Sequence, residues 1–274
     1  MTHSDMGRID GLIDIGANLT HASFQHDLAQ VLASARAAGV AQMVVTGADA
    51  DGSRAALALA LAYPRLLFAT AGVHPHHASA YDADTEALLR TLHAAPEVLA
   101  VGETGLDYHR NFSPREAQLF AFERQLELAV TCGKPLFLHQ RDAHADFVQC
   151  LDNVRGRIGR AVVHCFTGDK QELFDYLERD FYIGITGWIC DERRGAHLRE
   201  LVAAIPADRL MLETDSPYLL PRNLQPMPSH RRNEPRYLAH ICAEVARDRN
   251  EDVAVTAANA SAAARVFFGL PQPS

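Results

Sequence analysis

The expected fold follows from the stretch Val98–Glu103, which reads VLAVGE, a short apolar run that ends in a carboxylate. Three other apolar runs end in the same way, on an imidazole or a carboxylate. Apolar runs of this length are typical of parallel strands buried on both faces, and the carboxyl ends of such strands carry the active sites of α/β barrels. The repetition therefore predicts one site assembled from several strands. The runs are Val98–Gly102 before Glu103, Pro135–Leu138 before His139, Ala161–Val163 before His164, and Leu210–Thr214 before Asp215.

Eight apolar runs alternate with amphipathic stretches over the whole chain. This alternation is typical of a parallel βα fold, and eight units favour a closed (β/α)8 TIM barrel over an open doubly wound sheet. Because single barrels of ~250 residues are common and no polar linker divides the chain, we expect one α/β domain over residues 1–274, with an ordered core of about 9–270. The expected strands are Leu12–Ile15, Gln42–Thr46, Leu67–Ala71, Val98–Gly102, Pro135–Leu138, Ala161–Phe166, Phe181–Thr186 and Leu210–Leu212.

Helical patterns lie between these runs. The pattern over Ser113–Thr131 opens with a serine N-cap, with Pro114 at its first position and with Glu116 as a capping-box partner. Two extra helices are expected after the eighth strand, over about 234–249 and 252–268.

The composition limits the classes of partner. A formal net charge of −8, from 26 Lys and Arg against 34 Asp and Glu, argues against non-specific coating of nucleic acid or anionic membranes. A small basic cleft on an acidic body stays compatible with it. The chain has no glycine-rich phosphate loop of either common type, which argues against nucleotide-cofactor chemistry. Its five cysteines form no CxxC pair and do not suggest a disulfide framework.

The sequence shows no membrane or export signal. Residues Met1–Arg8 are polar and contain no apolar core of a signal peptide, and no run of ~18 apolar residues is present. We therefore expect a cytoplasmic enzyme without a membrane partner. We also expect a monomer, because the sequence indicates no apolar surface patch.

Glu103, His139, His164 and Asp215 are the candidate metal ligands, because carboxylates and imidazoles converging on one barrel end suit metal-assisted hydrolysis. Glu103 and Asp215 are also the candidate catalytic residues, with Asp215 positioned to take a proton from water. Imidazole suits transition metals and carboxylate suits Mg²⁺ or Mn²⁺, so these residue types do not decide which metal binds. Each residue alone also has a structural interpretation, such as a hydrogen-bonded core histidine or an aspartate that starts a turn before Ser-Pro.

Other side chains near the strand ends are candidates for supporting roles. Asp14, Asn18 and Glu213 are expected to orient the ligands. His74 follows the third strand and is expected to contact substrate or water. The next two histidines, His76 and His77, are expected to be solvated loop residues.

Arginines and aromatic residues also follow the strand ends. Arginine binds phosphate in a bidentate manner, so several on one face predict a phosphate site, although any one of them is equally typical of a surface salt bridge. Aromatic residues there either stack unpaired bases or pack the rim. The arginines are Arg110, Arg141, Arg222 and the pair Arg231–Arg232, and the aromatic residues are Tyr108, Trp188 and Tyr218.

Several motifs, in order over nearly the whole chain, resemble the TatD-type metal-dependent hydrolases. These motifs are Gly72–His76, Gly102–Tyr108, His139–His144, His164–Gly168 and Glu213–Leu219. The stretches that resemble the exonuclease branch of that family are Asp14–Thr20, Gly187–Gly195 and Arg232–Pro235.

The resemblance implies a TIM barrel of the metallo-dependent hydrolase type and a deoxyribonuclease that uses one or two Mg²⁺ or Mn²⁺ ions. It further implies 3′→5′ exonuclease activity on the ends of single-stranded DNA and RNA. By motif position, the metal and catalytic residues are Glu103, His139, His164 and Asp215.

The chain departs from the family pattern at two places. Gly16 and Asn18 occupy the positions where many members carry two histidines after the first strand, so we expect one tightly held cation and a weaker second one. Gln140 replaces a smaller residue after His139, which predicts a different pocket nearby. Two other functions stay open: hydrolysis of an ester or amide, such as a D-aminoacyl-tRNA linkage, and a non-enzymatic interaction scaffold.

Overall fold

Eight parallel strands form the centre of the computed structural model, which describes residues 9–272. Each strand pairs with the next in chain order, from β1 to β8. The last strand returns to the first, because Asp215 N donates to Gly16 O at 2.8 Å and Asn18 N donates to Ser216 O at 2.7 Å. The predicted (β/α)8 barrel is therefore confirmed. The strands are β1 Leu12–Ala17, β2 Val40–Val45, β3 Leu67–Ala71, β4 Val98–Asp107, β5 Leu136–Arg141, β6 Ala161–Val163, β7 Tyr182–Ile185 and β8 Leu210–Leu212.

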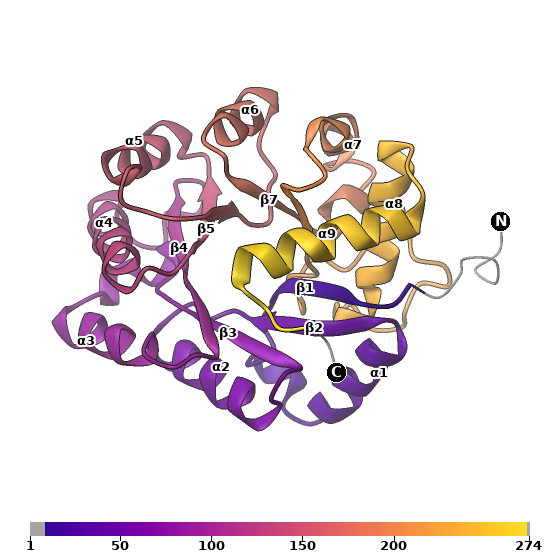
Figure 1. Cartoon of the computed structure of the whole chain (residues 1–274), viewed down its shortest axis with the longest axis horizontal. Coiled ribbons are helices and arrows are strands. Elements are labelled where there is room, and N and C mark those ends of the chain that lie inside the picture. Colours follow the sequence, from indigo (N-terminus) through magenta and orange to yellow (C-terminus); the bar gives the residue numbers. More distant parts are fainter. Residues whose placement is uncertain (1–8, 273–274) are drawn as a thin grey trace.

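Helices surround the barrel as an outer ring (Figure 1). The α-helices are α1 Leu28–Ala37, α2 Ala50–Ala62, α3 Ala83–Leu92, α4 Arg115–Cys132, α5 His144–Val154, α6 Lys170–Glu178, α7 Ala196–Leu201, α8 Leu238–Arg249 and α9 Val253–Phe268. The short 3-10 helices are η1 Ala22–Phe24, η2 Pro75–Ala80, η3 Gly187–Cys190, η4 Val202–Ala204 and η5 Pro235–Tyr237. Among the described residues, no helix combines the length and apolar character of a membrane span. Residues Met1–Arg8, where no signal peptide is expected, lie outside the described part.

Helix α9 crosses one end of the barrel (Figure 1). Its side chains Phe267 and Phe268 are buried in one apolar cluster with inward-facing strand residues such as Ile15, Phe137 and Met211. Burial of such large side chains stabilises the fold by roughly 1.5–3 kcal/mol each. This packing fills the barrel from its amino end and leaves the carboxyl ends of the strands for a site.

Strands β4 and β5 extend further than predicted, so Glu103 and His139 lie inside them. Gly102 and Gly105 adopt φ values of 144° and 145°, a region that favours glycine. These glycines let β4 continue against β5 through Asp107, because a side chain there would strike the neighbouring strand. A Cβ at Gly105 would lie 1.8 Å from the carbonyl oxygen of His139.

We expect Gly105→Ala to lower the free energy of unfolding by roughly 3 kcal/mol or more, because it combines a backbone clash with a strained φ. Urea denaturation followed by circular dichroism measures the change. Gly156→Ala is the matched control, since no atom lies within 4 Å of a Cβ at that position. Equal stability of the two variants would contradict this account of β4.

The predicted capping box of α4 is wrong. The helix begins at Arg115 with Pro114 as its N-cap, and no side chain caps it. The Ser113 hydroxyl instead accepts from Ser79 N and donates to His76 O, both at 3.1 Å. Ser113 is buried, and its hydroxyl satisfies backbone groups of η2, so a tertiary contact prevails over the local capping signal.

Candidate active site

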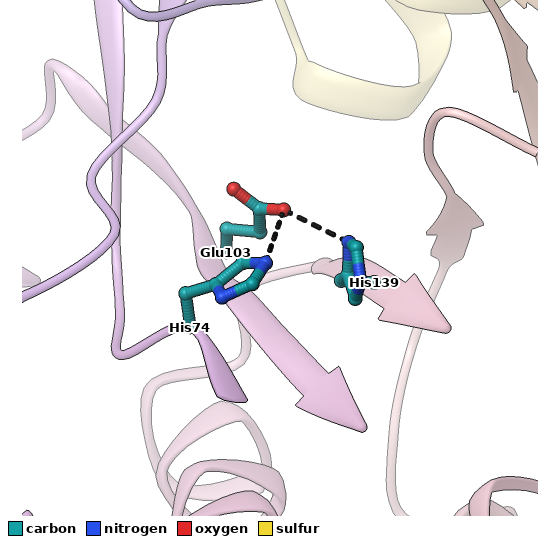
Figure 2. A group of neighbouring side chains, drawn as sticks. All are labelled: His74, Glu103 and His139. Atoms are coloured by element: carbon teal, nitrogen blue, oxygen red, sulfur yellow. Dashed lines mark ion pairs between the residues drawn. The ribbon is translucent and has the colours of Figure 1, made fainter. Parts of the chain in front are cut away.

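Three imidazoles approach one oxygen of Glu103 at the carboxyl end of the barrel. His74 Nε2 lies 3.3 Å, His139 Nδ1 3.2 Å and His164 Nε2 2.7 Å from Glu103 Oε1. Figure 2 shows the His74 and His139 rings each joined to this oxygen of Glu103. Glu103, His74 and His164 are buried. The structure therefore brings together three of the four predicted ligands, Glu103, His139 and His164, and adds His74.

Local backbone structure orients the His74 ring. His74 is the N-cap of η2, and its Nδ1 accepts a hydrogen bond from His76 N at 3.0 Å. An N-cap side chain that accepts this bond satisfies a free N–H group of the first turn. Nε2 is consequently the nitrogen that faces Glu103.

Opposite charges shift the titration of this cluster. Burial alone would raise the pKa of Glu103, but His74 and His164 outweigh it and hold that pKa well below its usual range. Burial lowers the pKa of His74 to about 4. For His164, burial opposes the charged ring, yet Glu103 and Glu213 raise its pKa well above the ordinary value. The site thus stabilises an ionised carboxylate beside positive charge.

The cluster has the donor set of a divalent metal site. Ligand atoms of His74, Glu103 and His139 all lie within 4.8 Å of one another. His139 Nε2 is buried without a hydrogen-bond partner in the described structure. Two imidazole nitrogens and a carboxylate oxygen are ligands that transition metals accept readily, whereas Mg²⁺ prefers oxygen. The residues present therefore fit a divalent cation.

Asp215 lies beside the cluster, three residues beyond the end of β8. Asn18 Nδ2 donates to Asp215 Oδ1 at 2.9 Å, which places the predicted supporting residue Asn18 against the predicted catalytic one. Burial raises the pKa of Asp215 to about 7, and the Glu103 charge contributes to the increase. A carboxylate with a pKa in this range is suited to exchange protons near neutral pH.

Glu213 occupies the space that a side chain at position 16 would need. A Cβ at Gly16 would lie 2.4 Å from Glu213 Oε2. The same oxygen contacts His164 Nδ1 at 3.3 Å, and the other carboxylate oxygen of Glu213 accepts from Cys165 N. Glu213 thus orients His164 from the barrel interior, and a side chain at Gly16 would require the Glu213 carboxylate to move.

Asp14 supports the same region from β1. Its carboxylate accepts from Thr214 Oγ1 at 2.6 Å and from Thr214 N at 2.9 Å. Burial raises the pKa of Asp14 to about 7. Asp14 therefore ties β1 to the segment that carries Asp215.

Asp107 and His76 lie against the cluster, although neither was among the site residues predicted from the sequence. Asp107 Oδ2 lies 2.8 Å from His76 Nε2 and 3.6 Å from His139 Nε2. The expectation that His76 is a solvated loop residue is wrong, because its pairing with Asp107 holds it against the site. The sequence spacing could have identified Asp107: Glu103 and Asp107 are four residues apart on one strand and so share a face.

We expect Asp107→Asn to lower metal affinity and kcat/KM by roughly 10- to 100-fold, the usual effect of removing a partner that orients a metal-binding histidine. Calorimetric titration with Mn²⁺ and a nuclease assay measure the two quantities. Asp146→Asn is a control, since Asp146 accepts from Tyr108 OH at 2.7 Å outside the cluster. An unchanged Mn²⁺ affinity in Asp107→Asn would exclude this orienting role.

Two arginines that follow strand ends are engaged in ion pairs. Arg222 Nη1 lies 3.8 Å from Asp191 Oδ2. Arg232 Nη2 lies 2.6 Å from Asp27 Oδ2 and 2.8 Å from Glu234 Oε1. Arg232 consequently joins α1 to the loop after β8, and the salt-bridge interpretation applies to it.

Arg110 and Arg141 follow or end the neighbouring strands β4 and β5. Arg110 is exposed in the loop after β4. Arg141 ends β5, and its guanidinium lies 6.0 Å from the centre of the Trp188 ring.

The predicted aromatic rim is only partly exposed. Tyr108 is buried, with the Arg115 guanidinium 4.1 Å over its ring, so base stacking on it is excluded. The Arg194 guanidinium covers a face of Trp188 at 4.3 Å. Tyr218 is exposed and meets the His21 ring edge-on at 5.8 Å.

Gln140 does not line the site. Its Nε2 donates to Tyr176 OH at 2.8 Å and to Glu172 Oε1 at 3.2 Å, and its Oε1 accepts from Ala143 N at 3.2 Å. Successive strand residues point to opposite faces, so Gln140 points outward from β5 while His139 points to the site.

An eight-stranded α/β barrel with a histidine–carboxylate cluster at the carboxyl ends of its strands defines the class of metal-dependent hydrolases. The model of the family described as TatD related DNase matches residues 13–269. The chain belongs to this family.

Relatives of known name support the assignment. A protein of Enterobacter lignolyticus named 3′-5′ ssDNA/RNA exonuclease TatD is 51% identical over 259 residues, which are 94% of this chain and 99% of that protein. The protein of the same name from Edwardsiella piscicida is 54% identical over 241 residues, which are 88% of this chain and 93% of the Edwardsiella protein.

Solved structures show the same fold. YJJV, a TatD homologue from Escherichia coli, superimposes with a TM-score of 0.85 at 29% identity, over 96% of this chain and all (100%) of that one. The L-hydantoinase of Arthrobacter aurescens shares the fold alone, with a TM-score of 0.52 at 10% identity over 75% of this chain and 57% of its own.

Proposed function

We propose that the protein is a metal-dependent 3′→5′ exonuclease that hydrolyses phosphodiester bonds of single-stranded DNA and RNA. The observation that carries the proposal is the convergence of His74, His139 and His164 on Glu103 at the open end of the barrel. The relatives named as 3′-5′ ssDNA/RNA exonucleases, which are 51% and 54% identical to this chain in sequence, support the choice of substrate.

We assign the metal to the side chains of the cluster. His74, Glu103 and His139 would hold one divalent cation, Mn²⁺ or Mg²⁺, and His164 and Asp215 would support a second that binds more weakly. Imidazole donors favour Mn²⁺ in this set. His74 then acts as a ligand in place of the substrate contact expected from the sequence. When bound, the cation polarises a phosphate oxygen and stabilises the negative charge that develops there.

The remaining chemistry belongs to side chains around the cluster. Asp215 accepts a proton from water, and the oxygen of that water attacks the phosphorus of the terminal phosphodiester. The bond from phosphorus to the oxygen of the leaving nucleotide breaks, and that oxygen takes up a proton from solvent and departs as a hydroxyl group. Asn18 holds the Asp215 carboxylate in position through its 2.9 Å hydrogen bond. Arg110 and Arg141 contact the neighbouring phosphates, where a guanidinium matches the geometry of the anion.

End-labelled oligonucleotides test the proposal. Single-stranded DNA, single-stranded RNA and blunt duplex DNA are each incubated with Mg²⁺, Mn²⁺ or EDTA. We expect stepwise shortening of single strands from the 3′ end with metal, faster than that of the duplex, and none in EDTA. Digestion that persists in EDTA, or that proceeds from the 5′ end, would refute it. A D-aminoacyl-tRNA arm separates this activity from ester hydrolysis.

A further inference from the structure

We propose that Phe112 is the platform on which an unpaired base of the substrate stacks. The inference rests on the proposed nuclease function and names a residue that recognises single strands. Phe112 lies between β4 and α4, at the carboxyl end of the barrel, and its side chain is 66% exposed.

A continuous series of rings connects Phe112 to the metal cluster. The Phe112 ring packs on the His76 ring with a centroid distance of 4.6 Å. The His76 ring lies 4.2 Å from that of His74, which lies 4.5 Å from that of His139. Phe112 is therefore held at the edge of the site, supported from beneath by a histidine that Asp107 fixes.

The exposed part of Phe112 has no evident structural purpose. A large apolar side chain left in water forgoes the stabilisation that burial would give, and the Phe112 ring stands next to a ring of the histidine series. Two of the other rim aromatics are less available for stacking: Tyr108 is buried, and Arg194 covers a face of Trp188 at 4.3 Å. The third, Tyr218, is exposed, but its ring meets that of His21 at 5.8 Å rather than a ring of the metal cluster.

Stacking on Phe112 accounts for a preference for unpaired nucleic acid. Every base offers a π-face, so stacking tolerates any sequence. In a duplex, neighbouring bases already cover both faces of each base, and a base must leave the stack before a side chain can reach it. The ring thus discriminates between strand forms without reading the sequence.

Kinetics of Phe112→Ala test the proposal on two single-stranded substrates. One oligonucleotide carries normal bases throughout, and the other carries two abasic residues at its 3′ end. Removal of one stacking ring is expected to raise KM on the normal substrate about 5- to 150-fold with a smaller change in kcat. Wild-type protein should therefore favour the normal over the abasic substrate, and Phe112→Ala should lose most of that preference.

Two further variants keep the test decisive. Phe112→Trp should retain the wild-type preference, because it restores a stacking ring. Phe120→Ala removes another exposed phenylalanine, 54% exposed on α4 and packed on Tyr81, and should match wild type.

Each outcome has a separate meaning. If wild-type protein degrades neither substrate, the nuclease function fails and the stacking proposal fails with it. If wild-type protein is active and folded Phe112→Ala shows the same KM and the same preference for bases, the stacking proposal alone is overturned. Circular dichroism establishes that each variant is folded.

Discussion

Glu103→Ala lowers kcat/KM on single-stranded DNA by about 10³-fold or more, since metal catalysis contributes several kcal/mol and each 1.36 kcal/mol is a factor of ten. Glu103 Oε1 is the atom on which three imidazoles converge. Without it, the remaining histidines lack the negative charge that favours a divalent cation. Initial rates on labelled oligonucleotide and calorimetric titration with Mn²⁺ should both show the loss.

The fold of this variant is expected to survive. His164 keeps its contact with Glu213 at 3.3 Å, and His139 keeps Asp107 at 3.6 Å, so the rings are not left without partners. Glu103→Gln, which preserves the volume but not the charge, should show nearly the same loss of activity. Digestion at the wild-type rate by folded Glu103→Ala would reject the assignment of this cluster as the active site.

Asp215→Asn is expected to lower kcat by about 10²–10⁴-fold, the usual contribution of a positioned general base. The amide retains the shape of the side chain beside Asn18 but cannot take a proton from water. KM should change much less than kcat, because the oligonucleotide is held elsewhere.

Single-turnover kinetics with excess enzyme separate these two parameters for Asp215→Asn. Asp51→Asn serves as the matched control, because the Asp51 side chain is 94% exposed and pairs only with the neighbouring Arg54 in the ion pairs of the described residues. A variant at Asp215 that loses affinity while keeping its chemical rate would assign this carboxylate to binding rather than to proton transfer.

The barrel was predictable because its strands are buried on both faces. Burial demands a continuous apolar run, and a run such as Leu67–Ala71 or Leu210–Leu212 matches the observed strand at both ends. The four polar residues after or within such runs were predictable for the same reason, since a polar side chain beside a buried strand stands out. Strand ends were less predictable where glycine continues the strand, as at Gly105 in β4.

Local signals failed where a distant partner competes for the same group. Ser113 carries the signature of an N-cap, but its hydroxyl is taken by the backbone of η2. His76 has the sequence context of a loop residue, yet Asp107 binds its ring at 2.8 Å. In both cases the deciding contact joins segments more than thirty residues apart.

By itself, the sequence determined the class of fold and the chemical types of the site residues, because burial patterns and strand periodicity are local properties that a chain carries in order. Tertiary structure alone decided which of these residues meet. It placed His74 with Glu103, filled the space beside Gly16 with Glu213, engaged Arg222 and Arg232 in ion pairs, and left Phe112 exposed at the mouth. These outcomes depend on strand register and side-chain direction across the barrel. Both bring together residues that are far apart in the sequence, and the sequence alone does not show that these residues are neighbours in space.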